Sequence, residues 1–181
     1  MKKMKGIILS GLVLGMLAGG ATSVVSADTT KQANRIAAAS LTLSDAKTIA
    51  LQTAGSGKVV SIDLDGNKAG YVYYDVTVLD GHTEKEYKID AVAGNILKAK
   101  QEYIDDYEDL QLTETDAQLS FEDAESILQQ RYPQAKIYDE ELDIKAGQLV
   151  YKLEALNGRQ KIKMTIDANS GRILAEKVKQ K

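Results

Sequence analysis

The sequence predicts an α+β protein built from two tandem modules, each with one helix packed on a four-stranded antiparallel β-meander. Two observations predict this organisation. The chain matches itself at an offset of 78 residues, which becomes 77 after one gap near Gly66. Within each copy, apolar residues first recur at helical spacing and then alternate, as they do in strands with one buried face.

The self-match keeps its order along the chain and includes turn residues as well as apolar ones. The matching segments are 42–46 (TLSDA) with 120–124 (SFEDA), 79–81 (LDG) with 156–158 (LNG), and 89–91 (IDA) with 166–168 (IDA). Chance does not explain matches that stay in order with a single gap. The two copies are therefore repeats of one structural unit.

Each copy opens with a predicted helix. Thr42 and Ser120 stand three residues before Asp45 and Asp123. This spacing is typical of a capping box, in which the hydroxyl and the acid each accept a hydrogen bond from the other residue's backbone N–H group.

The two helices are expected over about 43–54 and 121–132, where apolar residues recur at helical spacing. The segment 55–57 (GSG) ends the first helix, and Pro133 ends the second.

Strands follow each helix. Apolar residues alternate over 60–64 and 72–78, and less regularly over 149–153. Asp80-Gly81 and Asn157-Gly158 predict two-residue hairpin turns, because Asn, Asp and Gly tolerate positive φ.

A third and a fourth strand complete each meander. Gly94 and Gly171 close the tight turn between them and are expected to have positive φ. The third strands cover 84–89 and 161–166, and the fourth strands cover 95–99 and 172–177. A module of about 60 residues is marginal alone, so we expect the two to pack together, or each to bury the other's edge. We expect the two sheets to remain separate.

The first 27 residues have the layout of a secretory signal peptide. Lys2, Lys3 and Lys5 form a basic start, residues 7–18 form an apolar core that is short for a membrane span, and small side chains occupy 25–27 (VSA). This pattern predicts cleavage after Ala27, with an uncleaved N-terminal anchor as the alternative. The protein is then secreted, extracellular or loosely associated with the cell surface.

Composition excludes several function classes. The chain has no Cys, which excludes disulfides, thiol catalysis, thiolate metal sites and a lipid anchor on Cys. Removing residues 1–27 removes three lysines and no acid, so 20 basic residues face 26 acidic ones and the net charge becomes about −6. This balance argues against nucleic acid or anionic lipid as a partner.

Two segments flank the first module, which covers 41–100 and is followed by a second module at 119–178. Residues 28–40 are polar and Ala-rich and are predicted to be a flexible lead-in. Residues 101–118 form an acidic linker, with seven acids and no base over 102–116. Such a run is a solvated spacer, a collector of calcium or a dock for a basic partner. Tyr103, Tyr107 and Leu110 would let it pack on a module as a short helix.

Both modules resemble the PepSY family of small extracytoplasmic modules. The resemblance rests on the opening helices 43–50 (LSDAKTIA) and 121–128 (FEDAESIL), and on the closing pattern of a strand followed by D-A-x-x-G. That pattern reads YKIDAVAGNIL at 87–97 and MTIDANSGRIL at 164–174. The resemblance implies modules that occur in propeptides of thermolysin-like secreted metallopeptidases and in other envelope proteins, and that restrain peptidase activity. It implies no catalytic residues, and a peptidase partner would act in trans.

Few residues carry chemistry of their own. His82 is the only His and follows a turn without a partner motif for a triad or a zinc site. The segment 63–67 (DLDGN) resembles part of a calcium loop but lacks the closing Glu of an EF-hand, so a polar turn is the preferred interpretation. The sequence contains no phosphate-binding loop, paired-carboxylate motif or nucleophile elbow. We expect no catalytic residue, no metal site and no cofactor.

The sequence therefore predicts a secreted binding protein, with a regulator or inhibitor of extracellular peptidases as the first hypothesis. The alternative is a cell-envelope interaction or structural module without peptidase contact, assisted by calcium in one version. Candidate partner-binding residues lie at the two hairpin tips and in one aromatic pair: Asp80, Gly81, His82, Asn157, Gly158, Arg159, Tyr71 and Tyr73.

Overall fold

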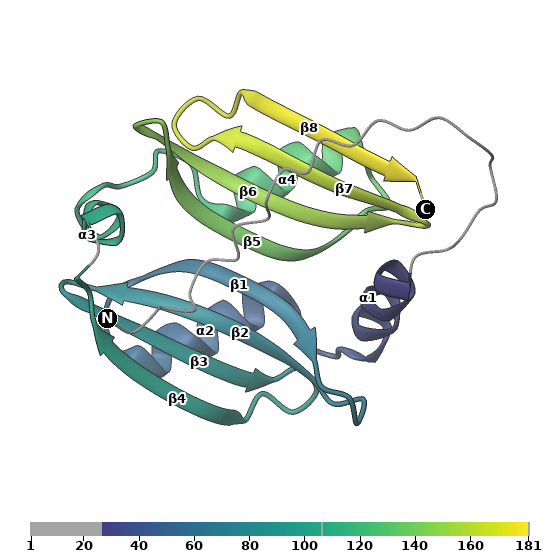
Figure 1. The fold of residues 1–181 in the computed structure, drawn as a ribbon, viewed down its shortest axis with the longest axis horizontal. Coiled ribbons are helices and arrows are strands. Elements are labelled where there is room, and N and C mark those ends of the chain that lie inside the picture. Colours follow the sequence, from purple (N-terminus) through teal and green to yellow (C-terminus); the bar gives the residue numbers. More distant parts are fainter. Residues whose placement is uncertain (1–26, 106, 181) are drawn as a thin grey trace.

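In the computed structural model, which describes residues 27–105 and 107–180, the strands of both copies form one antiparallel sheet (Figure 1). The sheet has eight strands in the order β4-β3-β2-β1-β5-β6-β7-β8. In the first module α2 (Leu43–Ala54) precedes β1 (Lys58–Gly66), β2 (Val72–Asp80), β3 (Thr83–Asp90) and β4 (Ile96–Tyr103). In the second, α4 (Phe121–Arg131) precedes β5 (Lys136–Lys145), β6 (Gln148–Asn157), β7 (Gln160–Asp167) and β8 (Ile173–Gln180).

The predicted fold class is confirmed, since each module is a helix followed by a four-stranded antiparallel meander. The expectation of two separate sheets is wrong. The first strands of the two meanders, β1 and β5, pair antiparallel with each other and join the sheets. Each module therefore covers an edge that the other would leave open, which satisfies backbone N–H and C=O groups that water would otherwise bind.

The helices α2 and α4 lie on the same face of the sheet (Figure 1). Both predicted capping boxes form, with Thr42 paired to Asp45 and Ser120 to Asp123. A tyrosine from the second strand fixes the segment before each helix: the hydroxyl of Tyr74 donates to the Leu41 carbonyl at 2.7 Å. The hydroxyl of its counterpart in the second module, Tyr151, donates to the Leu119 carbonyl at the same distance. Repeated residues therefore repeat their structural roles.

The D-A-x-x-G pattern has a physical explanation in the turn that it forms. The carboxylate of Asp90 accepts hydrogen bonds from the backbone N–H groups of Val92 and Ala93. The Ala91 carbonyl accepts from the N–H group of Leu41, which ties the turn to the start of α2. Gly94 then has a φ of 76°, and Gly171 of the second module a φ of 72°. The expected positive φ at both glycines is confirmed.

The predicted flexible lead-in is wrong for residues 28–38, which belong to helix α1 (Ala27–Ala38). The helix is fixed because Thr29 and Gln32 are buried and the side chain of Gln32 donates to the Leu64 carbonyl at 2.9 Å. Arg35 forms an ion pair with Asp65 on β1. Polar side chains that bond to the end of a strand stabilise this segment, although its composition resembles that of a linker.

The predicted linker is also more structured than a spacer. Residues 101–103 end strand β4, and α3 (Tyr107–Glu114) follows with Leu112 buried and Leu110 packed against the core. The expected short helix is present, but Tyr103 and Tyr107 are exposed instead of packed. Figure 1 shows α1 and α3 at opposite ends of the β1–β5 junction, between the two halves of the sheet.

The predicted signal peptide lies outside the described residues except for Ala27, where α1 begins. Within 27–105 and 107–180, no helix combines the length and the apolar character that crossing a membrane requires.

Replacing Gly94 with Val should lower the free energy of unfolding by about 1–3 kcal/mol, because Val resists positive φ. A Cβ atom at this position would also lie 3.2 Å from the Cδ1 atom of Ile49. Gly171→Val is the equivalent change, with Ile127 as the neighbour at 3.1 Å. Chemical denaturation measures the loss.

Gly81 provides the matched control, since its φ is 57° and a Cβ there would meet no atom within 4 Å. Gly81→Val should therefore cost less than Gly94→Val. An unchanged midpoint for both Gly94→Val and Gly171→Val would contradict the structural role of these turns.

Candidate interaction surface

The junction of the two modules is built on a pseudo-two-fold axis. Ile62 on β1 lies directly opposite Glu140 on β5, and these two positions are equivalent in the repeat, 78 residues apart. Ser61 and Asp63 lie opposite Glu141 and Asp139. Because β1 and β5 are antiparallel, the second module is turned by half a rotation relative to the first. Equivalent loops of the two modules therefore lie at opposite ends of the sheet.

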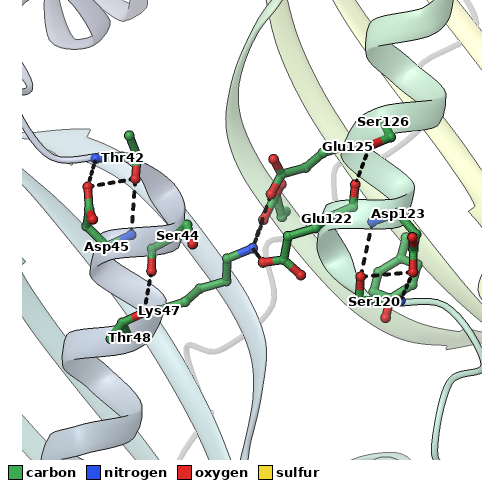
Figure 2. A network of polar contacts seen from close by, with 12 residues as sticks. Thr42, Ser44, Asp45, Lys47, Thr48, Ser120, Glu122, Asp123, Glu125 and Ser126 are labelled. Atoms are coloured by element: carbon green, nitrogen blue, oxygen red, sulfur yellow. Dashed lines mark hydrogen bonds and ion pairs between the residues drawn. The ribbon is translucent and has the colours of Figure 1, made fainter.

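A buried lysine links the helices across this axis (Figure 2). The Nζ atom of Lys47 on α2 lies 3.0 Å from Glu122 and 3.1 Å from Glu125, both on α4. It also lies 3.2 Å from Glu140 on β5. Lys47 and Glu125 are equivalent positions of the repeat. The two copies thus carry opposite charges where the axis brings equivalent residues together, whereas two identical modules would place like charges there.

Burial controls the charge state of this network. Glu140 is fully buried, and its desolvation raises its pKa to about 8 despite the attraction of Lys47. Burial opposes the charged form of Lys47 as well, but Glu140, Glu125 and Glu122 together hold the pKa of the lysine above its usual value. Lys47 is therefore the fixed cation around which three carboxyl groups gather.

A row of carboxyl groups crosses the opposite, open face of the same junction. Strand register places Asp75, Asp63, Asp139 and Glu154 side by side on β2, β1, β5 and β6. Burial, with Asp65 and Asp75 nearby, raises the pKa of Asp63 to about 7. Burial and the charge of Asp63 raise the pKa of Asp139 to about 8.

The ends of this row have cationic partners, unlike its centre. Lys88 lies 3.0 Å from Asp75, although burial still raises the pKa of that carboxyl. Glu154 is also desolvated, but its hydrogen bonds with Lys161 and Lys163 lower its pKa below the usual value. The uncompensated negative charge of the row is therefore concentrated where the modules meet.

Sequence reasoning missed this junction, although two signals were present. An acid at position 140 interrupts an alternating series of buried positions that otherwise carries Tyr138 and Leu142. Lys47 and Glu125 are an opposite-charge pair at equivalent positions of the repeat. Neither signal is visible until the modules are known to meet at β1 and β5.

A shallow groove of about 490 Å³ runs beside the Lys47 network, between α2 and the start of α4. Its apolar lining includes Leu51, Val59 and Phe121, and charged side chains come from Lys58 and Glu122. The groove is a contact surface shared by both modules and carries no recognisable catalytic set.

The first predicted hairpin tip adjoins a free sheet edge. All eight residues of β4 are exposed, and β4 is one outer strand of the described sheet. The ring of His82 stacks on Tyr103 at the end of β4, with ring centroids 5.7 Å apart. Asp80 is held by Lys85 at 2.7 Å and by Ser56 at 2.6 Å, while Gly81 is exposed at the turn. Tip and edge thus form one continuous border of module 1.

The second tip adjoins the other outer strand, β8. Gly158 and Arg159 are exposed and Asn157 is half-buried. The exposed apolar side chains of β8 are Leu174 and Val178, at 37% and 40%. On β4 they are Ile96 at 37%, Leu97 at 53% and Tyr103 at 71%, so the edge of module 1 offers the larger apolar contact.

Tyr71 and Tyr73 have different environments. Tyr71 is 69% exposed and precedes β2, whereas Tyr73 is half-buried within that strand. The Nζ atom of Lys88 lies 3.3 Å from the centre of the Tyr73 ring, and the Tyr73 hydroxyl donates to Asp65 at 3.4 Å. Tyr73 therefore belongs to the packed open face, and Tyr71 remains available for contact.

The segment 63–67 forms the end of β1 and a turn. The side-chain carbonyl of Asn67 accepts hydrogen bonds from the N–H groups of Ala69 and Tyr71, and Asp65 pairs with Arg35. Within 27–105 and 107–180, no group of three or more His, Asp or Glu side chains has the arrangement to hold a metal ion.

Two helix-and-meander modules joined into one sheet define the class as a tandem-repeat α+β protein whose accessible features are strand edges and hairpin tips. The chain belongs to the PepSY family, described as the peptidase propeptide and YPEB domain, which matches residues 40–100 and 118–177. The resemblance seen in the sequence is confirmed. PepSY is a domain associated with peptidase propeptides.

Two solved structures are similar to this chain at low identity, and the first of them shares its fold. A "putative lipoprotein" of Clostridium difficile 630 is 19% identical, with a TM-score of 0.51 over 78% of this chain and 95% of its own. The C-terminal domain of Bacillus megaterium YpeB is 15% identical, with a TM-score of 0.32 over 79% of this chain and 67% of its own. A search of the curated proteins found no match.

Replacing Lys47 with Met should lower the free energy of unfolding by about 3 kcal/mol, because it leaves a buried carboxyl without its cation. The loss should be smaller at pH 6 than at pH 9, since protonation neutralises Glu140 on the acidic side of a pKa of about 8. Urea denaturation at the two pH values measures both effects.

Two controls define the origin of the loss. The double variant Lys47→Met/Glu140→Met removes both charges and should recover most of the stability. Lys58→Met removes a lysine whose ionic partner, Asp116, is 94% exposed, and should cost under about 1 kcal/mol. A Lys47→Met loss no larger than that of Lys58→Met would show that the network does not hold the modules together.

Proposed function

We propose that this protein is an exported, non-enzymatic binding protein that contacts a secreted or surface peptidase in trans and slows it. The observation that carries the proposal is the border of module 1, where a fully exposed edge strand meets an exposed hairpin tip. The association of the family with peptidase propeptides supports a peptidase as the partner. The signal-like first 27 residues support export.

The physical route is strand addition at β4. An edge strand presents unpaired backbone N–H and C=O groups, which pair with an extended segment of a partner. Peptidase clefts bind extended chains, so their rims offer such segments. Leu97, Tyr103 and the neighbouring Tyr107 supply exposed apolar area beside the backbone, at 53%, 71% and 72% exposure. Aromatic anchors of this kind dominate the energetics of many interfaces.

The test adds the purified protein to the secreted peptidases of the producing organism and follows cleavage of a small fluorogenic substrate and of a protein substrate. We expect slower cleavage and a complex on a sizing column. Unchanged rates at tens of micromolar, with no complex, would contradict the proposal and leave the envelope-binding alternative.

A matched pair of variants locates the contact. Leu97→Ala/Tyr103→Ala removes the apolar anchors of β4, and we expect the inhibition constant to rise about tenfold, or about 1.4 kcal/mol. Leu174→Ala/Gln180→Ala changes the equivalent positions of β8 and should leave the constant within twofold. Equal effects of the two variants would contradict an interface at module 1.

A further inference from the structure

We infer that the β1–β5 junction is a pH-sensitive hinge, which holds the two modules in one sheet under mildly acidic conditions and releases them as its carboxyl groups lose protons. The inference goes beyond the proposed function and does not depend on it. Release would expose β1 and β5 as two further strand edges, so the hinge controls which edges a partner meets.

The junction is narrow compared with the ladders inside each module. Three residue pairs join β1 to β5, whereas eight join β1 to β2. One hydrophobic core continues through both modules, so the short ladder is the place where the sheet opens with the fewest backbone pairs lost. The helices α1 and α3 lie at its two ends and do not lengthen the ladder.

Four of the six residues in these pairs are acids, namely Asp63, Asp139, Glu140 and Glu141. Asp63 and Asp139 lie directly opposite each other, where like charges destabilise a strand pair. Glu140 faces the helices and is fully buried. Closing the junction therefore brings carboxyl groups together and removes them from water.

The charges that face Asp63 and Asp139 do not neutralise them. The charged groups that face Asp63 are Asp65 on its own strand, Asp75 on β2, Glu154 on β6 and Arg35 on α1. Those that face Asp139 are Asp63, Glu154, Glu141 on its own strand, and Lys163 of β7. Arg35 forms its ion pair with Asp65. Lys161 and Lys163 both pair with Glu154, and Lys88 pairs with Asp75. Lys152 is held by Glu141 and Asp143. Each neighbouring cation thus has another carboxylate as its closer partner.

On the helix face, Glu140 meets Lys47 of α2 together with Glu122 and Glu125 of α4. The hydroxyl of Tyr151 on β6 adds no charge, since burial raises its pKa to about 12. Three carboxyl groups share one lysine, so the cluster also carries excess negative charge when all are ionised. Both faces of the junction therefore respond to pH in the same direction.

The sign of the effect follows from proton binding. In the closed sheet the pKa values of Asp63 and Asp139 are raised to about 7 and about 8, from an ordinary value of 3.8. Separation returns both groups to water, so the open form binds fewer protons over this range. Closure is therefore strongest at low pH, weakens as pH rises from about 4 to about 8, and changes little above that.

The experiment measures the distance between the modules. The chain has no Cys, so spin labels attach only at introduced cysteines. Lys98→Cys on β4 and Lys177→Cys on β8 are exposed and span all eight strands. Seven strand spacings place them about 34 Å apart. We expect one narrow distance distribution at pH 5 and an added broad, longer component at pH 9.

Two controls complete the test. Asp63→Asn/Asp139→Asn removes the titrating pair of the open face and leaves Glu140, so its distance distribution should broaden less at pH 9 than that of the parent protein. Labels at Lys68→Cys and Lys98→Cys lie within module 1 and should report one distance throughout, which excludes unfolding as the cause. Identical distributions at pH 5 and pH 9 in the otherwise unsubstituted protein would overturn the hinge, whether or not the Asn variant folds. The hinge would also be overturned by an Asn variant that folds but whose distance distribution broadens at pH 9 as much as that of the parent protein.

Discussion

The pairing of β1 with β5 is the contact on which the rest of the architecture depends. A single helix-and-meander module would leave the first strand as an open edge beside a small core. Joining the two first strands removes both edges and produces one eight-stranded sheet. The helices α1 and α3 lie at the two ends of the short junction. Segments that resemble linkers in composition thus become part of the folded unit.

The pseudo-two-fold axis imposes a chemical condition on the repeat. Equivalent positions meet at the axis, so identical copies would juxtapose identical side chains. The two copies have diverged where this matters, because Lys47 meets Glu125 and Ile62 meets Glu140. Opposite charge at the axis favours pairing of the first module with the second over pairing of like modules. The same divergence leaves Glu140 buried with a raised pKa. The substitutions that make the two modules pair specifically therefore also make their junction sensitive to pH.

Local features of the fold could be predicted from the sequence, because short-range chemistry determines them. The capping boxes at Thr42 and Ser120, the hairpin turns and the positive φ of Gly94 and Gly171 each depend on a few consecutive residues. The β1–β5 pairing could not be predicted, since either edge of each meander could have met the other module. Helix α1 was missed because Thr29 and Gln32 are polar and become buried only against the finished sheet. The Lys47 network depends on the same pairing.

The geometry of the junction also limits how a partner can engage the sheet. The two outer strands, β4 and β8, are separated by the other six strands, and their hairpin tips lie at opposite ends. One compact partner therefore contacts one border at a time. The borders share Leu97 and Leu174 at equivalent positions but differ where Tyr103 corresponds to Gln180. His82, which stacks on Tyr103, corresponds to Arg159. Divergence between the copies has thus placed aromatic side chains on the border of module 1 and not on that of module 2. A partner that binds by strand addition distinguishes the two edges by these side chains.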